Sequence, residues 1–198
     1  MKLVFASNNK HKLQEVKDIL PKEITILSLH EIGFTQDIPE TGTTLEQNSN
    51  IKADTIWQWL QLQGKQQDFD GVFADDTGLE IQALNNAPGV YTARWAGEDC
   101  NDAANRQKAL HELQHTTQRQ AQFRTVITLI THTNTLQVQG IVKGQIALQE
   151  QGDHGFGYDP IFIPEGHTLT FAQLTAETKN SISHRARALQ ALGERLNS

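Results

Sequence analysis

The chain has 198 residues, of which 37% are hydrophobic, enough to bury a core and too many for a disordered chain. Its formal net charge is −6 and its 17 Lys and Arg residues are scattered, which argues against binding to a nucleic acid polymer. The single cysteine, Cys100, excludes an internal disulfide and a cysteine-rich metal site. Without a signal peptide or a long apolar span, we expect a cytoplasmic protein with no membrane partner.

Apolar runs and apolar residues at helical spacing predict strands that alternate with helices along the chain. The predicted strands are residues 2–6, 25–29, 71–76, 79–84, 121–133 and 135–148. The predicted helices are residues 12–20, 43–63, 102–115 and 180–196, with a polar loop at 7–12 and a turn at 85–89. The last two strands are rich in β-branched residues and form a predicted antiparallel pair. This order indicates one α/β domain over residues 1–198, built around a mixed sheet.

Two adjacent carboxylates, Asp75 and Asp76, end the apolar run "GVFADD". Neighbouring side chains of a strand point to opposite faces, so only one of the two acids faces any one site. A solvated turn is one interpretation, because Thr77 and Gly78 are ordinary turn residues. The alternative is a buried strand that carries the acids to a bound cation. Together with Glu40 in "DIPETGTT", they would form a hard-oxygen site that suits Mg²⁺ shared with substrate phosphates.

The loop "SNNKHK" follows the first strand and opens into a helix. A helix N-terminus offers free backbone N–H groups and a favourable dipole to phosphate, and Lys10 and Lys12 add positive charge. The loop lacks the glycines of a Walker A or dinucleotide-binding motif. Helix capping by Ser7 or Asn8 is the alternative interpretation.

The segment "HGFGYDPIFIPEG" places Gly155 and Gly157 on either side of Phe156. Glycines beside an aromatic residue allow a flat ligand to approach the backbone, and Asp159 would accept hydrogen bonds from its ring N–H groups. A glycine-bent strand is the alternative.

The segment "ETKNSISHRARAL" places Lys179, His184 and Arg185 around a predicted helix start, with Ser181 or Ser183 as its cap. The helix dipole disfavours cations at this end, so the pattern indicates an anionic or electron-rich partner.

Taken together, these motifs resemble the inosine triphosphate pyrophosphatase family, which hydrolyses non-standard purine nucleoside triphosphates. The resemblance covers nearly the whole chain through "FASNNKHKLQEV", "ETGTTLEQNSNIKA", "FADDTGLEIQALNNAPGVYTARWAG", "GFGYDPIFIP" and "QLTAETKNSISHRARAL". It implies a mixed central sheet flanked by helices, two lobes with a central active-site cleft, and a homodimer. It also implies a pyrophosphatase that uses Mg²⁺ to convert ITP, dITP or XTP to the nucleoside monophosphate and pyrophosphate.

Residue by residue, the resemblance implies that Asp76 is the catalytic base and that Glu40, Asp76 and Asp75 serve the metal. The triphosphate contacts that it implies are Ser7, Asn8, Asn9, Lys10, His11 and Lys12. The remaining substrate contacts that it implies are Thr77 and, at the nucleoside end, Phe156, Gly157, Tyr158, Asp159, Lys179, His184 and Arg185.

The chain departs from the family pattern at a few positions. His11 replaces the usual glycine, Pro39 replaces a frequent acid, Gln47 replaces a second glutamate, and Asn48-Ser49 replaces Asn-Ala. These changes concern the metal and the phosphate loop, and Pro39 and Gln47 leave room for a nucleotide-binding sensor without turnover.

Two enzyme classes compete with this interpretation. A haloacid-dehalogenase phosphatase needs an acid two places after its nucleophilic aspartate, where this chain has Thr77 or Gly78. A Maf-type nucleotide pyrophosphatase shares the general architecture, but the segments "SHR" and "FGYDP" speak against it.

Overall fold

The computed structural model describes residues 1–196 and contains alternating strands and helices. The strands are β1 (Lys2–Phe5), β2 (Thr25–Ser28), β3 (Gly71–Ile81), β4 (Ala87–Gly89), β5 (Gln120–Thr131), β6 (Thr135–Ile146) and β7 (Phe162–Pro164). The α-helices are α1 (Lys10–Ile19), α2 (Leu29–Ile32), α3 (Leu45–Leu62), α4 (Asp102–Glu112), α5 (Ala176–Ile182) and α6 (His184–Leu196). Short 3₁₀ turns are η1 (Gln66–Asp68), η2 (Gln82–Leu84) and η3 (Asp159–Ile161). No helix within residues 1–196 is both long enough and apolar enough to cross a membrane.

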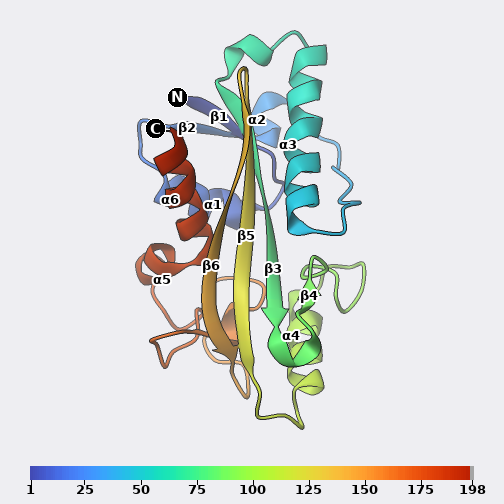
Figure 1. Ribbon diagram of the computed structural model, residues 1–198, viewed down its shortest axis with the longest axis vertical. Helices are drawn as coiled ribbons and strands as arrows, with labels where there is room; N and C mark the ends of the chain where they lie inside the picture. The colour runs from blue at the N-terminus through green and yellow to red at the C-terminus, as the bar shows by residue number, and fades with distance from the viewer. Residues whose placement is uncertain (197–198) are drawn as a thin grey trace. The chain divides into compact units, whose positions relative to one another are not determined.

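The described strands form one seven-stranded mixed sheet (Figure 1). Its order is β2-β1-β3-β5-β6-β7, with β4 paired to β3. Strand β1 is parallel to both β2 and β3, whereas β3–β4 and β6–β7 are antiparallel pairs. The predicted α/β class with a mixed sheet and flanking helices is therefore confirmed.

The chain divides into two compact units, in agreement with the two predicted lobes. Unit 1 contains residues 1–76, residues 125–140 and the segment from Ala186, and unit 2 contains residues 77–124 and 141–185. Strands β3, β5 and β6 contribute residues to both units. That residues 1–198 make up a single domain stays a prediction.

Helices cover both faces of the parallel strands in unit 1. Val4 and Val72 belong to one core cluster with residues of α2 and α3, and Leu3 and Phe73 belong to another with residues of α1 and α6. Figure 1 shows α3 on one side of β1 and β3, with α1 and α6 on the other. Parallel strands covered in this way are apolar on both faces, which explains the continuous apolar runs of β1 and β3.

Unit 2 has its own core on one face of its strands. Leu79 of β3, Phe123 of β5 and Val142 of β6 belong to this core. Ala109 of α4 and Leu113, the residue directly after α4, pack against them. The other side of the same strands carries polar residues, in line with the alternation expected of a sheet with one buried face.

Strand β3 runs without interruption through Asp75 and Asp76, so the interpretation of a solvated turn there is wrong. Gly78 has no left-handed φ, and both acids are buried. The strand pairs with β1 before the acids and with β4 after them. Because β3 has a partner strand both before and after the acids, and buried apolar residues flank them, an extended backbone is favoured there over a local turn.

Three other predicted features differ from the structure. Helix α1 begins at Lys10, and its cap is Asn9, whose side chain accepts a hydrogen bond from the Lys12 N–H, rather than Ser7 or Asn8. The single helix predicted over residues 180–196 is two helices, because Ser183 is extended and ends α5 just before α6 begins. The predicted turn at 85–89 contains the short strand β4.

Strands β6 and β7 approach closely at Gly144, which lies opposite Pro164 in this antiparallel pair. A Cβ at this position would meet the carbonyl oxygen of Ile163 and would lie 2.7 Å from Cζ of Phe162. We therefore expect Gly144→Ala to lower the free energy of unfolding by about 1–3 kcal/mol in urea denaturation.

Gly193→Ala is the matched control, because Gly193 lies in α6 and an added Cβ would have no described atom within 4 Å. This change should stabilise the protein by about 0.5–1 kcal/mol through helix propensity. Equal stability of the Gly144→Ala protein and the wild type would contradict the close approach of β6 and β7.

Candidate functional site

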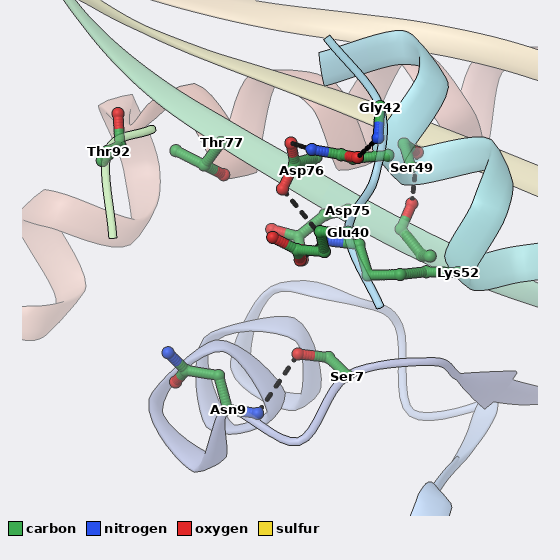
Figure 2. A network of polar contacts seen from close by, with 12 residues as sticks. Ser7, Asn9, Glu40, Gly42, Ser49, Lys52, Asp75, Asp76, Thr77 and Thr92 are labelled. Carbon is green, nitrogen blue, oxygen red and sulfur yellow. Dashed lines mark hydrogen bonds and ion pairs between the residues drawn. The ribbon is translucent and has the colours of Figure 1, made fainter. Parts of the chain in front are cut away.

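The first group of candidate residues lies in unit 1, where a buried lysine joins two of the predicted acids. The Nζ of Lys52, on α3, lies 2.6 Å from Oε1 of Glu40 and 2.9 Å from Oδ1 of Asp76. Figure 2 shows these three side chains converging from α3, from the loop before it and from β3. We call Glu40, Asp75 and Asp76, with Lys12 and Lys52, the carboxylate cluster.

Asp75 has a different ammonium partner from its neighbour. The Nζ of Lys12, on α1, lies 3.1 Å from Oδ1 of Asp75, which is 1% exposed. Helices α1 and α3 cover opposite faces of the parallel strands, so the two acids follow the alternation of the strand. Each acid thus has its own lysine, which offsets the repulsion between the adjacent carboxylates.

Burial sets the acid–base properties of the pair formed by Asp76 and Lys52. Burial raises the pKa of Asp76, with a further contribution from Glu40, and the ammonium groups of Lys52 and Lys12 offset it only in part. Burial disfavours the charge of Lys52, but Asp76, Glu40 and Asp75 together outweigh it and raise the lysine pKa. The result is a charged lysine beside a carboxylate that takes up a proton more readily than an ordinary aspartate.

Asn48 fixes the loop that carries Glu40 relative to Asp76. Its Oδ1 accepts a hydrogen bond from the Gly42 N–H at 2.8 Å, and its Nδ2 donates to Oδ2 of Asp76 at 3.4 Å. A Cβ on Gly42 would lie 2.6 Å from the same Oδ1, so this position requires glycine. Gln47, at a departure from the family pattern, accepts a hydrogen bond from the Thr43 N–H at 2.7 Å, next to the start of α3.

Ser49 stands where the family usually has alanine, and its hydroxyl contacts the backbone of β3. Its hydroxyl lies 3.0 Å from the Ala74 carbonyl oxygen and 2.8 Å from the Thr128 hydroxyl. The Nε2 of Gln137 donates to the same Thr128 oxygen at 2.8 Å. These contacts tie α3, β5 and β6 to the backbone immediately before the two acids.

The loop predicted to bind phosphate lies between β1 and α1. The Ala6 N–H donates to the Phe73 carbonyl at 2.8 Å, so the loop starts directly beside β3. The Ser7 hydroxyl accepts a hydrogen bond from the Asn9 N–H at 3.2 Å (Figure 2). Asn8, Lys10 and His11 are exposed, whereas Lys12 turns toward Asp75. Their contacts with a triphosphate stay a prediction.

The second group of candidate residues lies in unit 2 around a buried ion pair. The Nζ of Lys179, on α5, lies 2.6 Å from Oδ2 of Asp159, and both residues are buried. The same oxygen accepts a hydrogen bond from the Phe156 N–H at 2.9 Å. The Lys179 ammonium also lies 4.8 Å from the centre of the Phe156 ring. We call Phe156, Asp159, Lys179, His184 and Arg185 the aromatic–basic cluster.

The glycines of this loop serve its own geometry. A Cβ on Gly155 would collide with the Asp159 carboxylate, and Gly155 has a φ of +78°. The close approach that this glycine permits in the structure is therefore that of Asp159, and the approach of a flat ligand stays a prediction. Tyr158 donates its hydroxyl to the Thr92 carbonyl at 2.9 Å, and burial, with Asp102, raises its pKa so that it stays neutral.

His184 and Arg185 are buried, 5% and 1% exposed, so the basic helix start is not a solvated one. The His184 ring stacks on Phe123 with centroids 4.6 Å apart. Nη2 of Arg185 donates to the Thr77 hydroxyl at 3.3 Å, and its guanidinium lies 6.0 Å from the centre of the Phe156 ring. The electron-rich partners indicated by the sequence include aromatic rings of this chain.

Sequence reasoning missed Lys52 and Asn48 as site residues. The signal was present, because Asn48, Lys52, Ile56 and Leu60 recur at every fourth residue and all are buried. A lysine on the buried face of a helix requires an acidic partner, and Asp76 is such a partner for Lys52.

The donors of the carboxylate cluster suit a hard divalent cation. Among residues 1–196, no group of three or more His, Cys, Asp or Glu is arranged to hold a metal ion alone. Mg²⁺, however, is usually held by one or two carboxylates, water and the phosphates of a substrate. Glu40 and Asp76, which share the Lys52 ammonium, supply two such carboxylates.

The matching family model, the similar sequences and the similar solved structures all indicate the same family. A family model described as the Ham1 family matches residues 3–195. A dITP/XTP pyrophosphatase of Flavobacterium psychrophilum is 50% identical over 192 residues, covering 97% of each chain, and that of Porphyromonas gingivalis is 49% identical over 192 residues, covering 96% of this chain and 95% of the relative. The structure of the Staphylococcus aureus Ham1 protein superposes with a TM-score of 0.86 at 40% identity, covering 100% of this chain and 98% of that one.

The charge balance around Lys52 yields a prediction for Lys52→Met in buffer with a chelator. The change leaves Asp76 and Glu40 without their shared cation, and breaking a buried pair costs about 3 kcal/mol of unfolding free energy at neutral pH. The pKa of Asp76, already raised by burial, rises further without the lysine. Protonation removes the unpaired charge, so the deficit should shrink as the pH falls through that pKa.

Denaturant titrations between pH 5 and 8 measure this effect. The double variant Lys52→Met/Asp76→Asn is the control, and it should recover most of the lost stability because it removes the buried charge. A deficit that is independent of pH and is not relieved in the double variant would contradict the assigned role of Lys52.

Proposed function

The chain belongs to the Ham1 family, and from this we propose that it hydrolyses non-standard purine nucleoside triphosphates to the nucleoside monophosphate and pyrophosphate. The names of relatives about half identical to it over nearly their full length support this proposal. The observation that carries it is the carboxylate cluster, in which the buried Lys52 pairs with both the buried Asp76 and the partly exposed Glu40. ITP, dITP and XTP are the proposed substrates.

Asp76 is the proposed general base. Burial raises its pKa, which makes its carboxylate a better proton acceptor than an exposed aspartate. It takes a proton from a water molecule whose oxygen attacks the α-phosphorus. The bond between the α-phosphorus and the oxygen that bridges to the β-phosphorus breaks, and that oxygen leaves with pyrophosphate. Lys52 and Asn48 hold the carboxylate in place during this step.

Glu40 and Asp76 are the proposed ligands of a divalent cation, Mg²⁺, and Asp75 supports them from the other side of β3. When bound, such a cation neutralises phosphate charge and polarises the phosphorus–oxygen bond. The hard oxygen donors of the cluster support this choice over softer metals. Substrate phosphates would complete the ligand set.

Ser7, Asn8, Asn9, Lys10, His11 and Lys12 are the proposed triphosphate contacts. The loop stands at the N-terminus of α1, where the helix dipole favours anions. Lys12 contributes positive charge close to Asp75.

The aromatic–basic cluster is the proposed site for the purine base, together with Thr77, Gly157 and Tyr158. Hypoxanthine and xanthine carry a carbonyl acceptor at the six-position, whereas adenine carries an amino donor. Donors from His184 or Arg185 would therefore be satisfied by the former and left unpaired by adenine, at a cost of about 1–3 kcal/mol.

A homodimer acting in the cytoplasm is also proposed, and the family resemblance alone supports it. A nucleotide-binding sensor without turnover and a Maf-type enzyme of other specificity are the alternatives. The relatives favour neither; release of products separates the proposal from a sensor, and the choice of substrate separates it from a Maf-type enzyme.

The decisive experiment incubates the protein with ITP, XTP, GTP and ATP and quantifies nucleoside monophosphate and pyrophosphate. We expect ITP and XTP to be cleaved to equimolar monophosphate and pyrophosphate, with activity abolished by excess chelator and restored by Mg²⁺. Binding of ITP without product would identify a sensor. Full activity in excess chelator would remove the divalent cation from the proposal.

Asp76→Asn tests the assignment of the base. The change removes charge and basicity at nearly constant volume, so kcat for ITP should fall by roughly 100- to 10,000-fold while the protein stays folded. Asp68→Asn, an exposed position in η1, is the control and should retain wild-type kcat. Near-normal turnover by the Asp76→Asn enzyme would place the base at another residue.

A further inference from the structure

Helix α4 holds Gly157 of the candidate base loop through both of its backbone polar groups. The Gly157 N–H donates to Oδ2 of Asp102 at 2.8 Å, and its C=O accepts from Nη1 of Arg106 at 2.9 Å. Asp102 and Arg106 are four residues apart, so they lie on the same face of the helix. Neither belongs to the motifs assigned to the substrate, and all three residues lie in unit 2.

These two hydrogen bonds matter because Gly157 has no side chain to anchor it. Its φ is +62°, a left-handed conformation, and a Cβ built there would have no described atom within 4 Å. Side-chain packing therefore does not fix position 157. The Asp159 N–H donates to the Phe156 carbonyl at 3.2 Å, and the contacts with Asp102 and Arg106 hold the N–H and the C=O of Gly157 itself.

Arg106 is itself held in place. Its Nε donates to Oε2 of Glu150 at 2.9 Å, and only 16% of the Arg106 side chain is exposed. A guanidinium group uses its planar set of donors to bridge two acceptors in a fixed geometry, here the Glu150 carboxylate and the Gly157 carbonyl. Asp102 lies in the first turn of α4, where the helix dipole favours a carboxylate.

The residue before Gly157 carries the ring at the centre of the aromatic–basic cluster. The Phe156 ring lies 4.8 Å from the Lys179 ammonium and 6.0 Å from the Arg185 guanidinium. A rotation of the peptide between Phe156 and Gly157 would move this ring relative to both cations. A displacement of about 1 Å at a substrate-positioning group is enough to cost up to about 100-fold in rate.

We propose that Asp102 and Arg106 are positioning residues that orient the Phe156 ring, hold the base where His184 and Arg185 meet its six-position, and thereby set the preference for ITP over ATP. The proposal rests on the proposed function, since it takes the aromatic–basic cluster to be the site of the base. Neither residue touches the substrate in this proposal. Both act through Gly157.

The attachment of α4 to unit 2 does not depend on these two residues. Asn105, which is buried, accepts a hydrogen bond from the Ala96 N–H at 2.7 Å and donates to the Ala93 carbonyl at 2.8 Å. Ala109 and Leu110 contact the core of the unit. Variants at Asp102 and Arg106 should therefore fold, which allows their effect on the loop to be measured.

The first test measures the loop directly and does not require activity. Hydrogen–deuterium exchange of peptides that cover residues 155–158 should be about tenfold faster in Asp102→Ala than in wild type, because the Gly157 N–H loses its acceptor. Asp102→Asn keeps an acceptor oxygen and should restore most of the protection. Unchanged exchange in Asp102→Ala, or failure of both Asp102→Ala and Arg106→Ala to fold, would overturn the proposal.

The second test measures kcat and KM for ITP and ATP on the same proteins. In Asp102→Ala and Arg106→Ala, the ITP/ATP ratio of kcat/KM should fall by roughly tenfold, mainly through KM for ITP, because a misplaced base no longer satisfies the donors at its six-position. Gln107→Ala, at an exposed position of the same helix, should match the wild type. A ratio that stays within twofold of wild type, despite faster exchange, would overturn the role in base preference. Absence of ITP hydrolysis by the wild type would instead refute the proposed function.

Discussion

The ammonium group of Lys52 organises the carboxylate cluster and the part of unit 1 around it. Ile56 and Lys52 lie on the same buried face of α3, so the packing of this helix also places the lysine charge in the interior. Burial would neutralise this lysine, and Glu40 and Asp76 keep it charged. Helix α3 and strand β3 each bury one charge of this pair, so removal of either partner would leave a buried charge without a counter-charge.

Unit 2 contains a second buried lysine–aspartate pair, with different surroundings. Lys179 and Asp159 resemble Lys52 and Asp76 in that an α-helix supplies the cation, while the acid comes from the 3₁₀ turn η3 in one pair and from strand β3 in the other. Around Lys52 the neighbours are further carboxylates, whereas around Lys179 they are the faces of aromatic rings such as Phe156. The first arrangement suits metal and phosphate chemistry, and the second suits a planar ring.

The sequence predicted the order of strands and helices, because long elements carry a periodic apolar pattern, whereas α2 and β7 are too short to show one. Strand alternation also correctly predicted that Asp75 and Asp76 face different partners. Lys52 escaped notice because lysines are usually exposed, and only its helical phase relative to Ile56 marks it as buried. The sequence offered Ser183 as a candidate cap of a helix start, and α6 does begin at the next residue, but no pattern showed that a separate helix, α5, ends at the same serine.

The two-sided amide of Asn48 restricts which residues that position tolerates. Its oxygen is committed to the Gly42 N–H, so its nitrogen must face Asp76. Aspartate has the same shape but would present a second acceptor to the carboxylate, and leucine would leave the Gly42 N–H unsatisfied. The only side chain of that length that offers an acceptor on one side and a donor on the other is asparagine. Substitution at this buried position is therefore limited by which side-chain atoms accept and donate hydrogen bonds, and not by side-chain volume.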